Sequence, residues 1–195
     1  MFFRFFRRVA WIIGHIIYSF EVTGQENIPK EGAFLLCSNH IHVFDPIALA
    51  IFMKRDPRFM AKKELFKRRF FGWFLRNFNA YPIDRHAKAD LKAFRFTLDT
   101  LKDGHPVIIF SQGTRMKEFE NAKSGVAVFA LKANVPIVPA GIRGSFKFFS
   151  KVHVHYGEPI SVDEFAGQKV KTETVEKVME TVVARVSKLA SPPAA

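Results

Sequence analysis

The chain of 195 residues is long enough for one domain with a substantial core, and its 48% hydrophobic content excludes disorder as the default state. A net charge of +12, from 30 Lys and Arg against 18 Asp and Glu, requires an anionic partner such as nucleic acid, an acidic membrane or a phosphorylated substrate. The 23 phenylalanines suit an acyl–headgroup boundary, so we expect a membrane partner and no nucleic acid. The single cysteine, Cys37, excludes an internal disulfide and a cysteine-built metal site, and fits a reducing compartment.

Residues 1–20 are predicted to form an amphipathic helix. Its apolar face repeats at helical spacing through Phe2, Phe5, Phe6, Val9, Ile12, Ile13, Ile16, Ile17 and Phe20. The opposite face holds Arg4, Arg7, Arg8, Gly14, His15 and Tyr18. The uncharged stretch 9–20 is too short to span a bilayer, and no small-residue cleavage site follows it. We expect an uncleaved helix in the membrane interface with its arginines towards anionic headgroups; packing of its apolar face on its own domain is the alternative.

A turn-rich link at 21–32 precedes alternating strands and helices. Strands are expected at 33–37, 59–62, 80–83, 106–110, 135–142 and 152–156, and helices at 45–52, 64–78, 87–102, 124–133 and 169–189. This alternation predicts an α/β fold: a single-domain sandwich at 21–190 with a mixed, mostly parallel sheet flanked by helices, and a frayed tail at 191–195. The helix at 64–78 is apolar nearly all round, so it lies in the core or, less favoured, shares its surface with lipid.

The polar turn at 38–46 joins a buried strand to a helix that starts at Asp45. This geometry places His40 and Asp45 at the carboxyl end of a strand, where open α/β sheets have their sites. A neutral imidazole can accept a proton from an alcohol, and a carboxylate on its other nitrogen fixes the tautomer. An Asp helix cap beside a histidine bonded to backbone is the alternative, and it is favoured for any isolated pair at this spacing.

Four segments, in order, resemble the motifs of the bacterial lysophosphatidic acid acyltransferase family. The first is Asn39-His40 followed by four residues and Asp45. The second is the run 81–85, which ends in Arg85. The third is 110–115, ending Gln112-Gly113-Thr114-Arg115, and the fourth is the proline-containing strand at 135–140. Each motif alone is weak, but four in order are specific, and the resemblance extends over about residues 24 to 159.

The resemblance implies transfer of a fatty acyl group from an acyl thioester, acyl-CoA or acyl carrier protein, to a lysophospholipid hydroxyl. His40 would be the general base, oriented by Asp45. The acceptor phosphate would be bound by Arg85, Gly113, Thr114, Arg115 and, less strongly, Lys123, with Asn39 and Gln112 in support. No cofactor and no metal are implied, and the enzyme would lie on the cytoplasmic face of the cell membrane as a peripheral or monotopic protein.

Two features leave alternatives open. Gln112 stands where the family usually has glutamate, and the lost charge bears on the acceptor or the efficiency more than on the reaction class. His42, two residues from His40, allows a metal site as a less favoured alternative, because the spacing of binuclear hydrolases is not met. A different acceptor, and a basic membrane-binding protein without turnover, are the competing functions.

Overall fold

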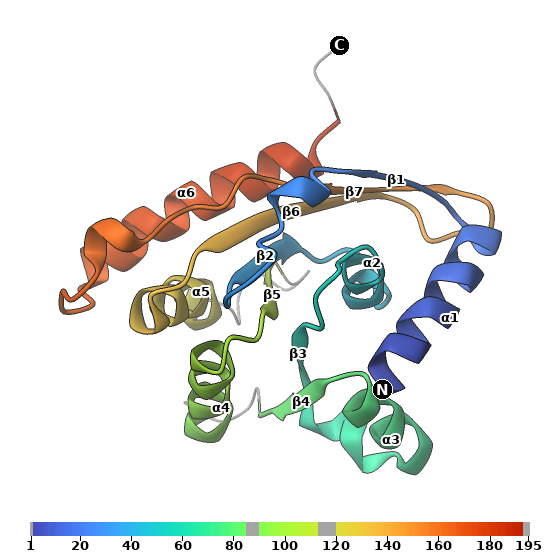
Figure 1. Cartoon of the computed structure of the whole chain (residues 1–195), viewed down its shortest axis with the longest axis horizontal. Coiled ribbons are helices and arrows are strands. Elements are labelled where there is room, and N and C mark those ends of the chain that lie inside the picture. Colours follow the sequence, from blue (N-terminus) through green and yellow to red (C-terminus); the bar gives the residue numbers. More distant parts are fainter. Residues whose placement is uncertain (1, 85–89, 113–119, 193–195) are drawn as a thin grey trace.

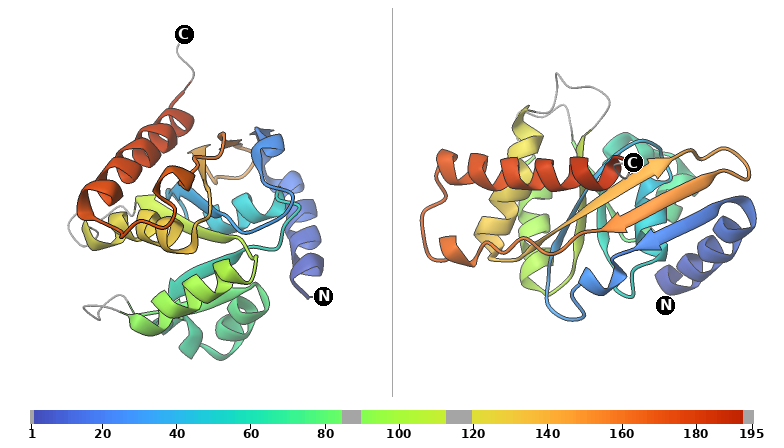
Figure 2. Two further views of the ribbon diagram at one scale, coloured as in Figure 1. Left: turned by 60° about the vertical axis from the view of Figure 1, so that its left-hand side comes forward. Right: turned by 90° about the horizontal axis from the view of Figure 1, so that it is seen from above.

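The computed structural model describes residues 2–84, 90–112 and 120–192. In this part of the chain, seven strands form one sheet with helices on both faces (Figures 1 and 2). The strands are β1 (Ser19–Thr23), β2 (Leu35–Asn39), β3 (Arg58–Lys62), β4 (Ala80–Ile83), β5 (Val107–Gln112), β6 (Ile137–Gly144) and β7 (Lys151–Tyr156). The helices are α1 (Phe2–Ile17), α2 (Asp45–Ile51), α3 (Arg69–Asn77), α4 (Leu91–Lys102), α5 (Glu120–Ala133) and α6 (Thr172–Ala190), with 3₁₀ turns η1 (Gln25–Asn27), η2 (Lys63–Lys67) and η3 (Asp163–Phe165).

The sheet order is β1-β7-β6-β2-β5-β3-β4, and every neighbouring pair is parallel except β6 with β7. This confirms the predicted α/β sandwich with a mixed, mostly parallel sheet. Parallel strands need crossover connections, and helices supply them here on either face.

Strand β2 lies at the centre of the sheet, between β5 and β6. Its residues are buried on both faces, as the continuous apolar run of a central parallel strand predicts. Leu35 and Cys37 enter the core under α4, α5 and α6, whereas Phe34 and Leu36 enter the core shared with α1, α2 and α3. The strand that leads to the polar turn is therefore held between two packed layers.

The predicted first helix is three residues too long. It ends at Ile17, and residues 19–23, including part of the predicted turn-rich link, form β1 at the sheet edge. β1 pairs in parallel with β7, in a register that joins Ser19 to Lys151. Its alternation is too short to recognise in sequence, because only Phe20 and Val22 face the core side. The prediction was wrong here because a partner strand far along the chain decides the conformation.

The predicted helix at 64–78 is divided into η2 and α3 by an extended residue, Arg68. Gly72 lets the two parts pack closely: a Cβ there would lie 2.3 Å from the carbonyl oxygen of Phe66. Phe78 is buried in the core, whereas Phe70 is 79% exposed. The segment therefore packs on the domain with one side and presents aromatic rings to solvent on the other.

The remaining predicted elements are present with shifted bounds. Asp90 caps α4, since its side chain accepts a hydrogen bond from the N–H of Ala93, and the helix begins at Leu91. Residues 87–89 of the predicted helix lie outside the described residues. α5 begins earlier than predicted, at Glu120, and α6 runs from Thr172 to Ala190. Residues 193–195 of the expected tail lie outside the described residues.

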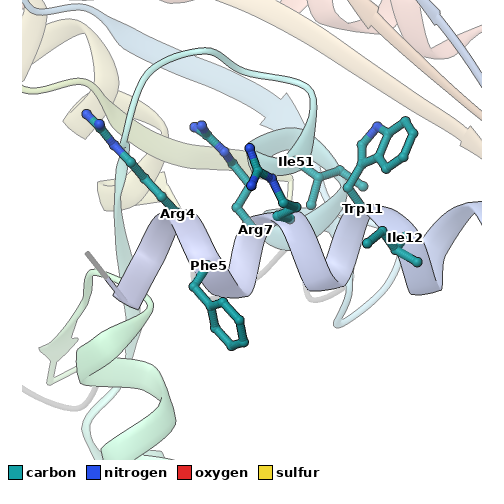
Figure 3. Close-up of a pocket in the computed structure, with 7 residues that line it drawn as sticks. Arg4, Phe5, Arg7, Trp11, Ile12 and Ile51 are labelled. Carbon is teal, nitrogen blue, oxygen red and sulfur yellow. The ribbon is translucent and has the colours of Figure 1, made fainter.

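Helix α1 packs on the domain with the side that holds Phe3, Arg7 and Gly14, and Phe6 packs against the same core. Arg7 donates to the carbonyl oxygens of Met53 and Arg55 and pairs with Asp56, to which Arg4 also donates. The opposite side faces outward: Ile12, Ile13, Ile16, Phe2 and Phe5 are all exposed. Figure 3 shows Arg4 and Trp11 leaving one side of α1 and Phe5 the opposite side.

This orientation bears on two expectations. Arg4 and Arg7 pair with Asp56 of the protein itself. The expected apolar face is divided: Phe6 packs against the core, whereas Ile12 and Ile16 are exposed. Among the described residues, no helix combines the length and the apolarity needed to cross a bilayer.

The contact between α6 and β6 can be tested at Gly141. An added Cβ would lie 2.3 Å from the carbonyl carbon of Leu189, so Gly141→Ala must displace the end of α6. We expect it to lower the free energy of unfolding by about 1–3 kcal/mol in urea titrations. Gly125→Ala is the matched control, because its Cβ would meet Phe129 only at 3.8 Å. Within helix α5 it should raise stability by about 0.5–1 kcal/mol. Equal stability of both variants would contradict the close packing.

Candidate active site

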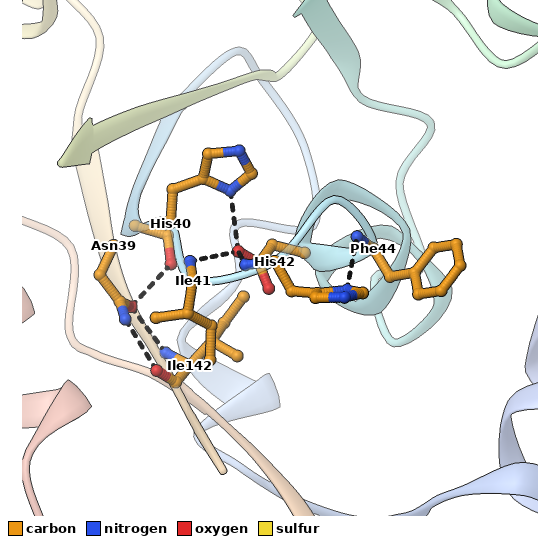
Figure 4. Close-up of polar contacts among 8 residues, drawn as sticks. Asn39, His40, Ile41, His42, Phe44 and Ile142 are labelled. Carbon is orange, nitrogen blue, oxygen red and sulfur yellow. Dashed lines mark hydrogen bonds and ion pairs between the residues drawn. The ribbon is translucent and has the colours of Figure 1, made fainter. Parts of the chain in front are cut away.

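The turn between β2 and α2 brings His40 and Asp45 together. β2 ends at Asn39 and α2 begins at Asp45, so the chain reverses within five residues. The Nδ1 atom of His40 lies 2.8 Å from Oδ2 of Asp45. Figure 4 shows the turn, with the contact of the His40 ring as a dashed line. The contact predicted from the sequence is therefore present at the carboxyl end of a central strand.

Asp45 is held by the backbone of its own turn. Its side chain is fully buried, and Oδ2 also accepts hydrogen bonds from the N–H groups of Ile41 (2.6 Å) and His42 (2.7 Å). These bonds run back into the turn, and no side-chain bond caps α2, where Phe44 is the N-cap residue. The alternative of a simple Asp helix cap is therefore wrong. Asp45 closes the turn and fixes the position of Oδ2.

Within the part of the chain that the structure describes, the His40 ring has one nitrogen bonded and one without a partner. A carboxylate only accepts hydrogen bonds, so Nδ1 carries the proton in the neutral ring and Nε2 carries the lone pair. The ring packs against Phe110 of β5, with centroids 4.5 Å apart, and its side chain is 36% exposed. His40 can therefore accept a proton at Nε2 from a group that arrives from solvent.

Asn39 fixes the base of the same turn. Its amide group pairs with the backbone of Ile142 in both directions: Nδ2 donates to the carbonyl oxygen at 2.7 Å, and Oδ1 accepts from the N–H at 2.8 Å. These bonds extend the contact of β2 with β6 beyond the last backbone pair, Ser38 with Ala140. Asn39 is buried, so its role is to position the turn that contains His40.

His42 lies between two aromatic rings. It stacks on Phe146, which follows β6, with ring centroids 4.8 Å apart and an angle of 18°. Its Nδ1 accepts a long hydrogen bond from the N–H of Phe44, whose ring also contacts Phe146. Sequence analysis did not identify Phe110 or Phe146 as neighbours of the two histidines, because both contacts join segments that are far apart in the chain.

The phosphate-binding candidates follow strands that end at the same edge of the sheet. β2, β5, β3 and β4 are mutually parallel, and β5 ends at Gln112 and β4 at Ile83. Gln112 is paired with Asn39 through the backbone register, and Lys123 lies in α5. Arg85, Gly113, Thr114 and Arg115 lie outside the described residues. The assembly of these groups into one phosphate site therefore stays a prediction.

Three charged residues near the end of β4 have hydrogen-bond partners. Lys63 donates to the carboxylate of Asp84, and this hydrogen bond raises the pKa of Lys63. The backbone N–H groups of Ala93 and Asp84 donate to Asp90 and lower the pKa of that carboxyl group. These contacts fix the segment that leaves β4 just before Arg85.

Comparisons with known proteins identify the family of the chain. The Acyltransferase family model matches residues 19–143. The chain is 31% identical to the 1-acyl-sn-glycerol-3-phosphate acyltransferase of Bacillus subtilis over 176 residues, covering 87% of each chain. It is 30% identical to the enzyme of that name from Streptococcus pneumoniae over 172 residues, covering 84% of this chain and 63% of the relative.

A solved structure is also similar. The crystal structure of the 1-acyl-sn-glycerophosphate (LPA) acyltransferase PlsC from Thermotoga maritima matches with a TM-score of 0.70 and 25% identity, over 99% of this chain and 81% of that one. The α/β domain described here is thus the fold of a lipid acyltransferase. The chain belongs to the acyltransferase family, and it is an enzyme of acyl transfer.

The two backbone hydrogen bonds to Asp45 predict that Asp45→Asn keeps the tautomer of the His40 ring. The N–H groups of Ile41 and His42 both point at the Oδ2 position, so the asparagine must place its oxygen there. We expect the His40 ring to keep its proton on Nδ1, visible as an unchanged nitrogen pattern in long-range ¹⁵N–¹H NMR spectra at high pH. The NH₂ group of the asparagine would then lie at the Oδ1 position, where the carboxylate oxygen has no partner among the described residues. A buried NH₂ group without an acceptor should lower the free energy of unfolding by about 1–3 kcal/mol.

Asp45→Ala is the control for this experiment. It removes the acceptor altogether, so the two neutral tautomers of His40 should both appear. A tautomer change in Asp45→Asn would show that the backbone does not fix the Oδ2 position.

Proposed function

We propose that the chain transfers a fatty acyl group from acyl-CoA or acyl carrier protein to the sn-2 hydroxyl of 1-acylglycerol 3-phosphate, forming phosphatidic acid for phospholipid synthesis. One observation supports this most directly. The His40–Asp45 pair lies at the carboxyl end of β2, in a chain whose relatives are named for this reaction. The pair provides the proton acceptor that a lipid alcohol needs to become a nucleophile.

The proposed step needs no covalent enzyme intermediate. Nε2 of His40 takes the proton of the acceptor hydroxyl as its oxygen attacks the thioester carbonyl carbon. The new C–O ester bond forms, the C–S bond breaks, and the imidazolium returns the proton to the leaving thiolate. Asp45 stabilises the imidazolium through Nδ1, and a general base of this kind contributes about a hundredfold to ten-thousandfold in rate.

The acceptor phosphate is assigned to the cationic segments that follow β4 and β5. Arg85 and Arg115 would provide forked guanidinium donors, Thr114 a hydroxyl, and Gly113 a close backbone approach. Lys123 would add a further cation near the start of α5, with Gln112 and Asn39 in support. The parallel strands bring the ends of β4, β5 and β2 to one edge, so these segments all begin on the side of the sheet where His40 lies.

Membrane attachment is assigned to the outward face of α1. Five large apolar side chains on the outward face of this helix are exposed while Arg4 and Arg7 bind the domain, so this face is available to lipid. An amphipathic helix of this type lies in the interface and does not cross the bilayer. We therefore propose a peripheral or monotopic enzyme on the cytoplasmic face of the membrane, close to its lipid acceptor.

The catalytic assignment predicts the activity of two variants. The wild-type protein, mixed with lysophosphatidic acid and an acyl thioester, should release free thiol and form phosphatidic acid. His40→Ala should lower kcat at least about a hundredfold, because the proton acceptor is lost. Asp45→Asn should lower kcat as well, because the imidazolium loses its counter-charge, while its acceptor KM changes little.

His105→Ala is the matched control, because His105 is exposed at the opposite end of β5 and should leave the rate unchanged. A panel of lysolipid acceptors tests the specificity that Gln112 calls into question. Absence of thiol release with every donor and acceptor would refute the assignment, and full activity of His40→Ala would refute the role of that residue.

The attachment assignment predicts loss of membrane binding in Ile12→Ser/Ile16→Ser. These side chains are 48% and 68% exposed, so the fold should be unaffected, while co-sedimentation with anionic vesicles should fall at least about tenfold. Point variants are preferred to truncation, because Phe3 is buried in the core and Phe20 belongs to β1. Leu91→Ser on α4, 63% exposed over the opposite face of the sheet, is the control. Undiminished sedimentation of the double variant would place attachment elsewhere.

A further inference from the structure

The turn between β6 and β7 exposes two adjacent phenylalanines. Phe148 and Phe149 are 78% and 83% exposed, at residues 148 and 149 between Gly144, where β6 ends, and Lys151, where β7 begins. A short turn normally has polar residues or glycine at its tip, because exposed rings gain nothing from folding. The catalytic assignment above makes no use of these two side chains.

Phe149 is also held in an unfavourable backbone conformation. Its φ angle is +61°, in the left-handed region that glycine and asparagine adopt far more readily than an aromatic residue. The turn is fixed around it: Ser150 donates to the carbonyl oxygen of Lys147 through both its N–H and its hydroxyl group, and the N–H of Phe149 donates to the carbonyl oxygen of Ile17. The two rings are therefore presented by a tied turn and not by a loose loop.

The turn continues the outward apolar face of α1. Phe149 lines one surface hollow together with Ile16 and Ile17, at the end of that helix. At the other end of α1, Phe6 contacts Trp73 of α3, which contacts the exposed Phe70. Figure 1 shows α3, α1 and the β6–β7 turn along one side of the molecule. Exposed apolar side chains thus occur on three elements that lie along this side of the molecule.

The same turn segment contacts the loop that contains His40. Phe146 stacks on His42 and contacts Phe44, and its carbonyl oxygen accepts a hydrogen bond from the hydroxyl of Tyr18 at the end of α1. The loop itself exposes Val43, at 68%. Phe146 therefore packs the active-site loop against the segment that exposes Phe148 and Phe149.

We propose that the β6–β7 turn is a second membrane-docking element, in which Phe148 and Phe149 enter the acyl–headgroup boundary of an anionic bilayer beside the active-site loop. The exposed Lys147 of the turn and Arg8 of α1 are placed to meet acidic headgroups, in keeping with the net charge of +12. The inference rests on the proposed function for its biological purpose, which is to dock the active-site loop at the surface that holds the acceptor. The inference itself concerns the affinity of the protein for a membrane, which can be measured without substrate turnover.

The experiment compares partitioning of the full chain into vesicles of phosphatidylglycerol and phosphatidylcholine. Phe148→Ser/Phe149→Ser should lower the partition coefficient at least about tenfold without loss of thermal stability, because both side chains are exposed. Phe149→Gly should lower it as well while keeping or raising stability, since glycine suits the positive φ. Phe96→Ser, which removes a 43% exposed ring of α4 over the other face of the sheet, should bind vesicles like the wild type.

Kinetics separate docking from catalysis. With acceptor presented in vesicles, the double variant should show a raised apparent KM and an unchanged kcat, and with a short-chain monomeric acceptor it should match the wild type. Reduced partitioning in a protein that transfers no acyl group would support the docking inference and refute the proposed function. Wild-type partitioning of both turn variants would overturn the inference, as would a dimer of the wild type that dissociates in the double variant, because the rings would then cover a second copy of the chain.

Discussion

The buried carboxylate of Asp45 is the contact on which the site depends. One oxygen accepts from two backbone N–H groups and from the His40 ring, so the turn, the start of α2 and the imidazole share a single acceptor. A buried carboxylate is costly unless it accepts hydrogen bonds. Here Oδ2 has three donors before any substrate arrives, while Oδ1 has no partner among the described residues. The orientation of His40 is therefore a property of the folded loop. Two contacts complete the support: Asn39 bonds to Ile142 of β6, and Phe110 of β5 packs against the His40 ring.

The sequence predicts this arrangement where the determining forces are local. An apolar run, a polar turn and a proline in the first turn of a helix are sufficient to place β2, the loop and α2, and the short spacing makes the contact of His40 with Asp45 feasible. The supporting contacts are not local. Asn39 meets Ile142, and His42 meets Phe146, only because β2 and β6 are neighbours in the sheet. No periodicity along the chain encodes these pairs, so the site could be located from sequence but not its surroundings.

In the first helix too, local sequence determines the element and distant contacts determine its orientation. Its spacing predicts a helix with one apolar side, but spacing does not decide which side meets the domain. The outcome depends on Arg7, which satisfies two backbone carbonyl oxygens and a carboxylate at the end of α2, and on Gly14, which lets the helix approach. A guanidinium group with several acceptors in fixed positions binds more favourably here than in water. The part of the apolar face that holds Ile12 and Ile16 is left outward because the side with Arg7 has the better-matched partner.

The position of β1 in the sheet has a consequence for how the molecule is made. Among the described strands, this edge strand pairs with β7 alone, in a register that joins Ser19 to Lys151. Most of the domain must therefore be synthesised before β1 can pair. Contacts of such long sequence separation form late, because the intervening chain must first be ordered. The hydrogen bond from the N–H of Phe149 to the carbonyl oxygen of Ile17 likewise forms only after residue 149 has been synthesised. On a translating ribosome, α1 therefore emerges long before the edge that fastens it, and its apolar side can reach a bilayer while the sheet behind it is still incomplete.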